Sequence, residues 1–272
     1  MADKLDLEAL REHLAALQKQ VPTGEIDSTG FTKPQLKLLH EELEATIRRL
    51  EWLDSQLDPI KMPGSVFDPS DAQVVGKLIG DKLLEQKRVP LALVDQFYGS
   101  GVYALYYLGS FDAYAPISGT DTPIYVGKAD PADRYAPDVR AQGDRLSRRL
   151  AEHRKSVGHA KNLKINDFDC RFLVVKTAWQ FTTEHYLIDL FKPVWNSEMR
   201  VCYGFGKHGD SASTRGNTRS PWDTLHPGRP WATQEGNKPN RLGEKGIKKL
   251  IAAHFANHPP QYSEKIHPRR PK

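Results

Sequence analysis

The chain has 272 residues, which is enough for one large domain or for a catalytic domain with appendages. Its hydrophobic content of 39%, with 5 Trp, 10 Tyr and 10 Phe, excludes global disorder, and its apolar runs are too short to span a membrane. The formal net charge of +5 is unevenly spread: residues 197–272 carry 14 Lys and Arg against 6 Asp and Glu, whereas residues 1–60 carry 7 against 12. A basic C-terminal region suits an anionic polymer, although a solubilising tail would have the same composition.

The first 60 residues predict two amphipathic helices. Leucines recur at three- and four-residue spacing over 5–21 and again along a segment that begins near Thr32 and Pro34, which fit a helix start. Pro and Gly residues at 22–30 separate the two segments. We expect a helical hairpin whose apolar stripes dock on the main domain or on a second subunit. Packing of the two helices within the chain explains the same pattern.

The compartment is indicated by two features of the sequence. Residues 1–6 lack the basic and apolar blocks of a signal peptide. Cys170 and Cys202 form neither a disulfide framework nor a zinc motif. The sequence therefore predicts a protein of a reducing cytoplasm.

The middle of the chain predicts a small antiparallel sheet. A helix of about 71–87, ended by Pro90, precedes strands at 101–108, 123–128 and 168–176, where the pattern changes to period two. The expected fold is α+β: a three-stranded antiparallel sheet flanked by helices, with an N-terminal helical hairpin and a basic C-terminal extension. The predicted divisions are the hairpin (1–60), a linker and helix (61–96), a core (97–196) and the basic extension (197–272).

Two helices of this core carry polar side chains on their apolar sides. In a helix of about 143–157, Arg149 and His153 are four residues apart and lie one above the other beside the buried stripe. An inward Arg or His needs an anionic or polar partner. Glu184 opens the next helix, where the helix dipole favours a carboxylate. Each position alone also fits the border of a core or a helix cap, but together with tyrosines on both strands they indicate a site.

In this order, the residues resemble the active site of the GIY-YIG nuclease superfamily, in particular its restriction-enzyme branch. The resemblance covers residues 97–196, and each of the two strand motifs has Val in place of Ile. The matching positions are Gly101-Val102-Tyr103 for GIY, Tyr125-Val126-Gly127 for YIG, Arg149 and His153 for the helical pair, Glu184 for the metal-binding Glu, and Asn196 for the closing Asn.

This resemblance implies a type II restriction endonuclease of a prokaryotic cytoplasm, which cuts a GC-rich palindrome of the CCGCGG kind by hydrolysis. Glu184 is expected to hold one divalent cation, Mg²⁺, and Arg149 to stabilise charge that develops on the phosphate. Tyr103 is expected to orient or deprotonate the attacking water. Because a phenol with a pKa near 10 is a poor base, His153 is its candidate partner.

The remaining two site residues have expected roles in binding. Tyr125 is expected to hydrogen-bond the phosphate or the water, and Asn196 to tether Glu184 or the substrate backbone. We expect direct in-line attack without a covalent intermediate, which follows from the resemblance and not from the residues themselves.

Specific cleavage of double-stranded DNA also requires contacts to bases, and GC-rich sites favour Arg on guanine. A palindrome is most simply cut on both strands by a two-fold dimer, so we expect at least a homodimer, with a tetramer left open. The basic and polar residues predicted to contact DNA are Lys128, Arg148, Arg200, Lys207, Arg215, Asn217, Arg219 and Arg229.

Three other functions fit parts of the sequence. The same site could serve a GIY-YIG DNA repair or structure-specific endonuclease, although such relatives usually carry additional modules. Asp71 with Glu85-Gln86-Lys87 mimics the acidic–acidic–lysine motif of another nuclease superfamily, but it falls in an expected helix rather than a strand. A degenerate site would leave a binding module, and the completeness of the six-residue set argues against it.

Overall fold

The structure is a computed structural model that describes residues 6–60, 63–176, 179–206, 218–232 and 237–261. The chain forms two compact units, Met1–Phe67 and Asp68–Lys272. None of the described helices is both long and apolar enough to cross a membrane.

The first unit contains helices α1 (Leu7–Gln20) and α2 (Lys33–Leu57). Asp6 caps α1 by accepting hydrogen bonds from two backbone N–H groups. Thr32 and Gln35 form a capping box at the start of α2, which confirms the predicted helix start. Of the described residues in these two helices, none is buried. The packed hairpin therefore stays a prediction.

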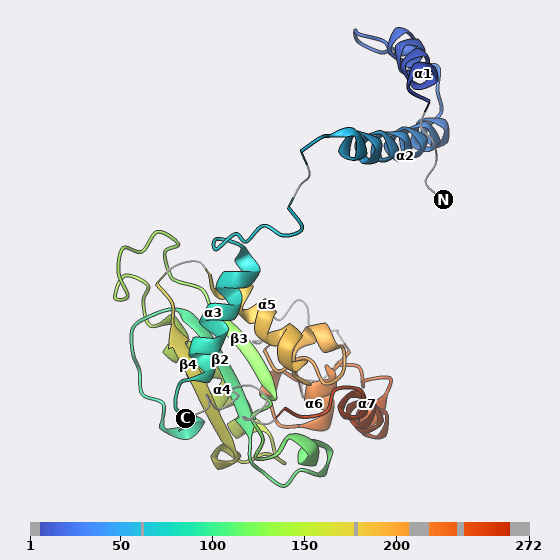
Figure 1. Ribbon diagram of the computed structural model, residues 1–272. Helices are drawn as coiled ribbons and strands as arrows, with labels where there is room; N and C mark the ends of the chain where they lie inside the picture. Colours follow the sequence, from blue (N-terminus) through green and yellow to red (C-terminus); the bar gives the residue numbers. More distant parts are fainter. Residues whose placement is uncertain (1–5, 61–62, 177–178, 207–217, 233–236, 262–272) are drawn as a thin grey trace. The chain divides into compact units, whose positions relative to one another are not determined.

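The second unit is built on an antiparallel sheet, which has four strands in the described part of the chain. The strands lie in the order β1-β4-β2-β3 (Figure 1). The predicted number of three is wrong because Val89 pairs with Cys170 and adds an edge strand. A strand of two residues is too short to show the period-two alternation on which the prediction depended. The strands are β1 (Val89–Pro90), β2 (Gly101–Tyr107), β3 (Tyr125–Ala129) and β4 (Phe168–Val174).

The central strand β2 carries the first of the two motifs. It pairs with β3 on one side and β4 on the other, and all seven of its residues are buried. At Gly101, a Cβ atom would overlap the carbonyl oxygen of Leu173 on β4. The first glycine of the motif is therefore required by the close approach of a neighbouring backbone.

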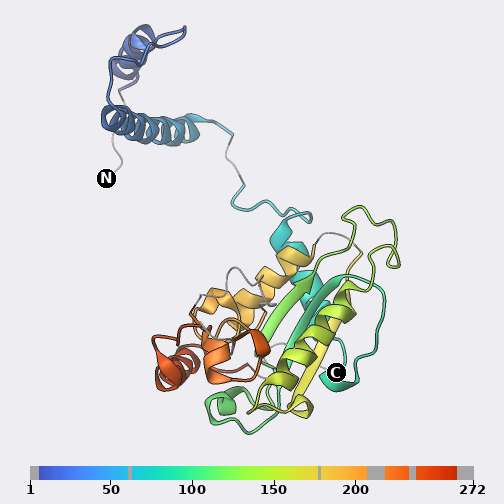
Figure 2. The ribbon, with the colours of Figure 1, turned by 180° about the vertical axis from the view of Figure 1, so that it is seen from behind.

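Helices cover both faces of the sheet. The views in Figures 1 and 2 show α3 (Ala72–Leu84) and α5 (Gln180–Phe191) on one face and α4 (Arg145–His159) on the other. Helices α3 and α5 approach closely at Gly80, where a Cβ atom would lie 2.9 Å from the ring of Tyr186. Alternate residues of β2 point to opposite faces, and Tyr103 belongs to the core cluster on the α4 side.

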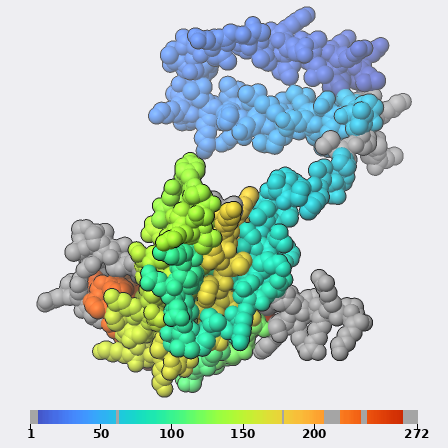
Figure 3. All heavy atoms as spheres, turned by 90° about the vertical axis from the view of Figure 1, so that its left-hand side faces the viewer, coloured from blue at the N-terminus to red at the C-terminus, as the bar shows by residue number. Residues whose placement is uncertain are grey.

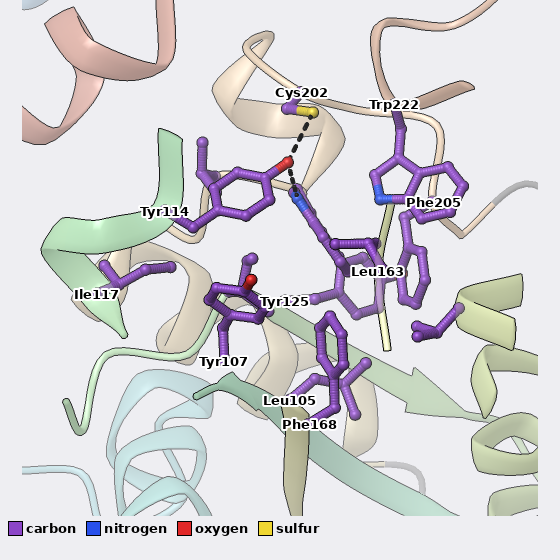
Figure 4. Close-up of a cluster of buried hydrophobic side chains, with 14 of the residues drawn as sticks. Leu105, Tyr107, Tyr114, Ile117, Tyr125, Leu163, Phe168, Cys202, Phe205 and Trp222 are labelled. Carbon is purple, nitrogen blue, oxygen red and sulfur yellow. Dashed lines mark hydrogen bonds between the residues drawn. The ribbon is translucent and has the colours of Figure 1, made fainter. Parts of the chain in front are cut away.

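Part of the predicted C-terminal extension completes this α4-side core. Trp222 of α6 (Pro221–Leu225) and Ile251 of α7 (Gly243–Asn257) are fully buried in the same cluster as Tyr103. Figure 4 shows the aromatic centre of the cluster, where the Tyr114 hydroxyl lies 3.5 Å from Cys202 Sγ. The same hydroxyl lies 2.7 Å from His226 Nε2 and accepts a hydrogen bond from Trp195 Nε1. The described segments after residue 197 are therefore built into the second unit.

The connection from β3 to α4, residues 130–144, extends away from the sheet (Figures 1 and 2) and forms a projection in the space-filling view (Figure 3). Tyr135 within it is 78% exposed. Its end is nevertheless fixed, because the Gly99 N–H donates to the Gly143 carbonyl and the Leu146 N–H donates to the Gly99 carbonyl. These two bonds hold the start of α4 against the chain that leads into β2.

Candidate active site

The two motif tyrosines lie side by side on the α4 face of the sheet. Tyr103 is fully buried, Tyr125 is 9% exposed, and their ring centroids are 6.2 Å apart. The Tyr103 ring crosses the backbone of β3 at Gly127, where a Cβ atom would overlap the phenol oxygen. The second motif glycine is therefore needed to seat the first motif tyrosine.

Helix α4 places Arg149 and His153 over the Tyr103 phenol. His153 Nε2 lies 2.6 Å from Tyr103 Oη, and Arg149 Nε donates to the same oxygen at 3.3 Å. Burial raises the pKa of Tyr103 well above its usual value, the neighbouring Tyr125 adds to this, and the Arg149 guanidinium opposes it. The structure thus joins a buried phenol to the imidazole expected as its partner, and also to a guanidinium.

Residues 204–206 border the site beside His153 and Arg149, and the sequence analysis did not predict a role for them. The Phe205 ring stacks on His153, with centroids 4.5 Å apart and an angle of 16°. The Gly206 carbonyl accepts a hydrogen bond of 3.1 Å from Arg149 Nη2. A Cβ atom at Gly206 would come within 2.6 Å of Tyr125 Oη, so this position also needs glycine. The sequence signal that could have indicated this segment is its pattern of an aromatic residue between two glycines, Gly204-Phe205-Gly206.

Glu184 reaches the site from the first turns of α5. Burial raises the pKa of its carboxyl to about 7, an effect that the Lys128 ammonium opposes and the carboxylates of Glu198 and Asp130 increase. The backbone of Lys128, which directly follows the second motif, also opposes the rise in this pKa. After burial, the Glu184 charge is also among the causes that raise the pKa of Tyr125. The carboxylate is therefore part of the same site.

Asn196 has a different place from the one expected. Its Oδ1 accepts from the Val126 N–H at 3.0 Å and its Nδ2 donates to the Val126 carbonyl at 2.9 Å, so both amide atoms bind the β3 backbone. The side chain is only 4% exposed. The expected tether to Glu184 is thus corrected: Asn196 fixes β3 between the second motif tyrosine and its glycine.

The donor chemistry around Glu184 fits a divalent cation. A half-buried carboxylate whose pKa is raised gains when a positive charge binds to it, and oxygen is the donor that Mg²⁺ prefers. Among the described residues, no group of three or more His, Cys, Asp or Glu side chains is arranged to hold a metal. A cation held here would have few protein ligands and would keep positions for water and phosphate oxygens, as Mg²⁺ usually does.

Apart from Arg229, the residues predicted to contact DNA fall into three groups. Arg148 and Arg200 are exposed, and Arg219 is half-buried. Lys128 pairs with Asp130. The described residues do not include Lys207, Arg215 or Asn217.

The prediction that Arg229 contacts DNA is corrected by its burial. Its side chain is fully buried, and its Nε donates to Asp223 at 2.7 Å. A side chain in this position cannot reach a DNA groove. Its basic character in a segment rich in Arg and Gly explains why the sequence suggested otherwise.

An antiparallel sheet with tyrosines on adjacent strands, and an Arg and a His above them, defines a nuclease domain of the GIY-YIG type. The family model described as the Eco29kI GIY-YIG domain matches residues 95–255, which is more than half of the chain, and the chain belongs to this family. Its class is therefore that of the restriction endonucleases, which act on DNA. No curated protein matches the chain significantly.

Proposed function

We propose that the protein is a type II restriction endonuclease that cuts both strands of a GC-rich palindrome by Mg²⁺-dependent hydrolysis. The observation that carries this proposal is the convergence on one buried phenol. Tyr103 Oη lies 2.6 Å from His153 Nε2 and 3.3 Å from Arg149 Nε. The charge of Glu184 also raises the pKa of Tyr103, although burial and the charges of Tyr125 and Arg149 have larger effects on this pKa. An imidazole and a guanidinium in contact with one phenol, with a carboxylate whose charge acts on it, are groups that phosphodiester hydrolysis uses.

The short contact between Tyr103 and His153 supplies a path for a proton. With His153 Nε2 unprotonated, the Tyr103 hydroxyl donates to it. As water attacks phosphorus, its proton passes to Tyr103 Oη while the phenol proton passes to His153 Nε2. The new P–O bond forms as the bond to the leaving oxygen breaks, and solvent protonates that oxygen. This relay avoids a free phenolate, which the raised pKa of Tyr103 makes scarce.

Arg149 is suited to bind the phosphate itself. Its Nη2 is held by the Gly206 carbonyl and its Nη1 by Glu152, both at distances above 3.0 Å. A charged phosphate oxygen is a stronger acceptor than a neutral carbonyl, so DNA would compete for this guanidinium. Transfer of the contact from Gly206 to phosphate would place the positive charge where negative charge develops.

Glu184 would hold the Mg²⁺, which when bound neutralises phosphate charge and promotes ionisation of water. The residue itself is placed for this by α5, where it is half-buried beside the Lys128 ammonium that acts on its pKa. Among the residues proposed to bind DNA, Lys128, Arg148, Arg200 and Arg219 lie in described parts of the structure. The proposed assembly is a homodimer, since a two-fold axis matches a palindrome.

Cleavage of a supercoiled plasmid tests this proposal. Discrete fragments that require Mg²⁺ and vanish with EDTA are the expected result. Smeared products, or cleavage confined to branched or nicked DNA, would support the repair and structure-specific alternative instead. Sedimentation of the purified protein should give the mass of a dimer. A rate that increases with the number of sites per plasmid would indicate that dimers pair into tetramers.

Substitution of the second motif glycine should impair cleavage strongly. In Gly127→Ala, the added methyl group overlaps the Tyr103 phenol, so the ring must move away from His153 and Arg149. We expect the cleavage rate to fall by about 100-fold, the typical effect of a 1 Å misplacement. The matched control is Gly158→Ala on the exposed side of α4, where nothing lies within 4 Å of the new Cβ. The control should cleave normally and melt at the same or a higher temperature.

A further inference from the structure

We infer that Arg229 is a positioning residue for the active site, which it serves by holding residues 204–206 against His153 and Arg149. The inference rests on the proposed function and deepens it. Arg229 lies 80 residues after Arg149 in the sequence and is fully buried. Its guanidinium makes three kinds of contact: one holds this short segment, and the other two hold the guanidinium itself.

The first contacts are hydrogen bonds to the backbone beside the site. Arg229 Nη1 donates to the Phe205 carbonyl at 3.0 Å, and Nη2 donates to the Gly204 carbonyl at 2.8 Å. Gly204 has a φ of +112°, a conformation that residues with a side chain rarely adopt. A fixed fork of donors thus binds two successive carbonyls in an unusual stretch of backbone.

The second and third contacts fix the guanidinium itself. Its Nε donates to the Asp223 carboxylate at 2.7 Å, and Ser220 Oγ donates to the other oxygen of that carboxylate at 2.7 Å. The guanidinium lies over the ring of Trp222 at 4.4 Å and that of Trp231 at 5.0 Å. The cation is therefore held in one orientation by α6 and its neighbours.

The segment held in this way contacts both site residues of α4, His153 and Arg149. Phe205 packs on Trp222 with ring centroids 5.3 Å apart (Figure 4). The same Phe205 ring also stacks on His153, with ring centroids 4.5 Å apart. The next residue, Gly206, binds Arg149 through its carbonyl. A shift of this segment would release the imidazole that receives the proton and the guanidinium that receives the phosphate.

Lysine cannot replace this arginine without loss. Lysine keeps the charge, but its donors all lie on one nitrogen atom. It therefore cannot bind Asp223, Gly204 and Phe205 at the same time, as the planar guanidinium does. In Arg229→Lys we expect kcat to fall about 10- to 100-fold, as small misplacements of catalytic groups do. The KM and the Kd for DNA in Ca²⁺ should stay within about twofold, because Arg229 is buried and does not face DNA.

If Arg229 only stabilised the fold, its substitution would leave the NMR signals of the His153 ring unchanged. In protein labelled with ¹³C-histidine, the His153 resonances, assigned with His153→Gln, should shift when the Phe205 ring current is lost. This spectrum is recorded without DNA or Mg²⁺, so it tests the positioning even if the protein cleaves no DNA. The matched control is Arg88→Lys, which weakens another ion pair, to Asp121 at 2.6 Å, among residues packed on the opposite face of the sheet. It should lower the melting temperature but leave kcat and the His153 signals unchanged.

A second variant covers the case in which Arg229→Lys does not fold. Asp223→Asn keeps the volume and weakens only the charge-assisted bond to Arg229. It should give a smaller fall in kcat, of about threefold to tenfold, and the same direction of shift for His153. Unchanged kcat and unchanged His153 signals in whichever of the two variants folds would overturn the inference, as would equal losses in Arg88→Lys. Absence of any cleavage by the wild type, together with shifted His153 signals, would instead refute the proposed function.

Discussion

Glu184→Gln is expected to abolish DNA cleavage while DNA binding persists. The substitution keeps the size of the side chain and one polar oxygen, but it removes the charge that would hold the cation. A bound metal ion contributes several kcal/mol to the stabilisation of the transition state, so the rate should fall by at least about 1,000-fold. Gel-shift titration in Ca²⁺ should give a Kd within about threefold of the wild type, since phosphate contacts from basic residues dominate affinity.

The same substitution should stabilise the folded protein, in a manner that depends on pH. The folded-state pKa of Glu184 is about 7, above the ordinary value of 4.5, because the charged form is disfavoured by burial. Between these pH values the folded state keeps a proton that the unfolded state loses. The free energy of unfolding of the wild type therefore falls as pH rises from about 4.5 to about 7.

Glutamine has no such proton, so the melting temperature of Glu184→Gln should exceed that of the wild type by an amount that grows over this pH range. At pH 8 the difference in the free energy of unfolding is of the order of 3 kcal/mol. Mg²⁺ should raise the melting temperature of the wild type but not of the variant. Glu244→Gln, in the first turn of α7, is the matched control and should show none of these effects. Full cleavage by Glu184→Gln would remove the carboxylate from the mechanism.

The local part of this site was predictable because its residues are set by short-range geometry. Period-two alternation placed Tyr103 and Tyr125 on strands, and a spacing of four placed Arg149 and His153 on one helix face. The strands pair with Tyr103 opposite Gly127, which brings the motifs together. The family resemblance then supplied the order of the elements, which single patterns could not have given.

The parts that could not be predicted depend on contacts between distant segments. The bond from Arg149 to the Gly206 carbonyl joins residues 57 apart in sequence, and its acceptor is a backbone oxygen that every residue possesses. Arg229 has the composition of a DNA contact and becomes buried only because Asp223 and two carbonyls meet it inside the fold. Asn196 likewise binds backbone atoms of Val126. Such partners leave no pattern in the sequence of one chain.

Tyr103→Phe is the second substitution with a large expected effect, because it removes the single oxygen on which the site converges. Without that hydroxyl, the proton from the attacking water has no path to His153 Nε2, which now lies 2.6 Å from Oη. General base catalysis typically contributes 10²- to 10⁴-fold, so we expect a loss of about that size in kcat. The KM should change little, since the proposed role of the hydroxyl is in proton transfer and not in DNA binding, and the ring remains in the core.

The matched control for this substitution lies four residues along the same strand. Tyr107 is also buried in the α4-side core, and its hydroxyl accepts a hydrogen bond of 2.8 Å from the Phe111 N–H. Tyr107→Phe should therefore cost about 1 kcal/mol of stability and leave kcat unchanged, as single-turnover cleavage and thermal melts of the two variants would show. If Tyr103→Phe kept more than about a tenth of wild-type kcat, well above the range for loss of a general base, the relay through the phenol would be excluded. His153 would then have to accept the proton from the water directly, and His153→Gln alone should cause the large loss.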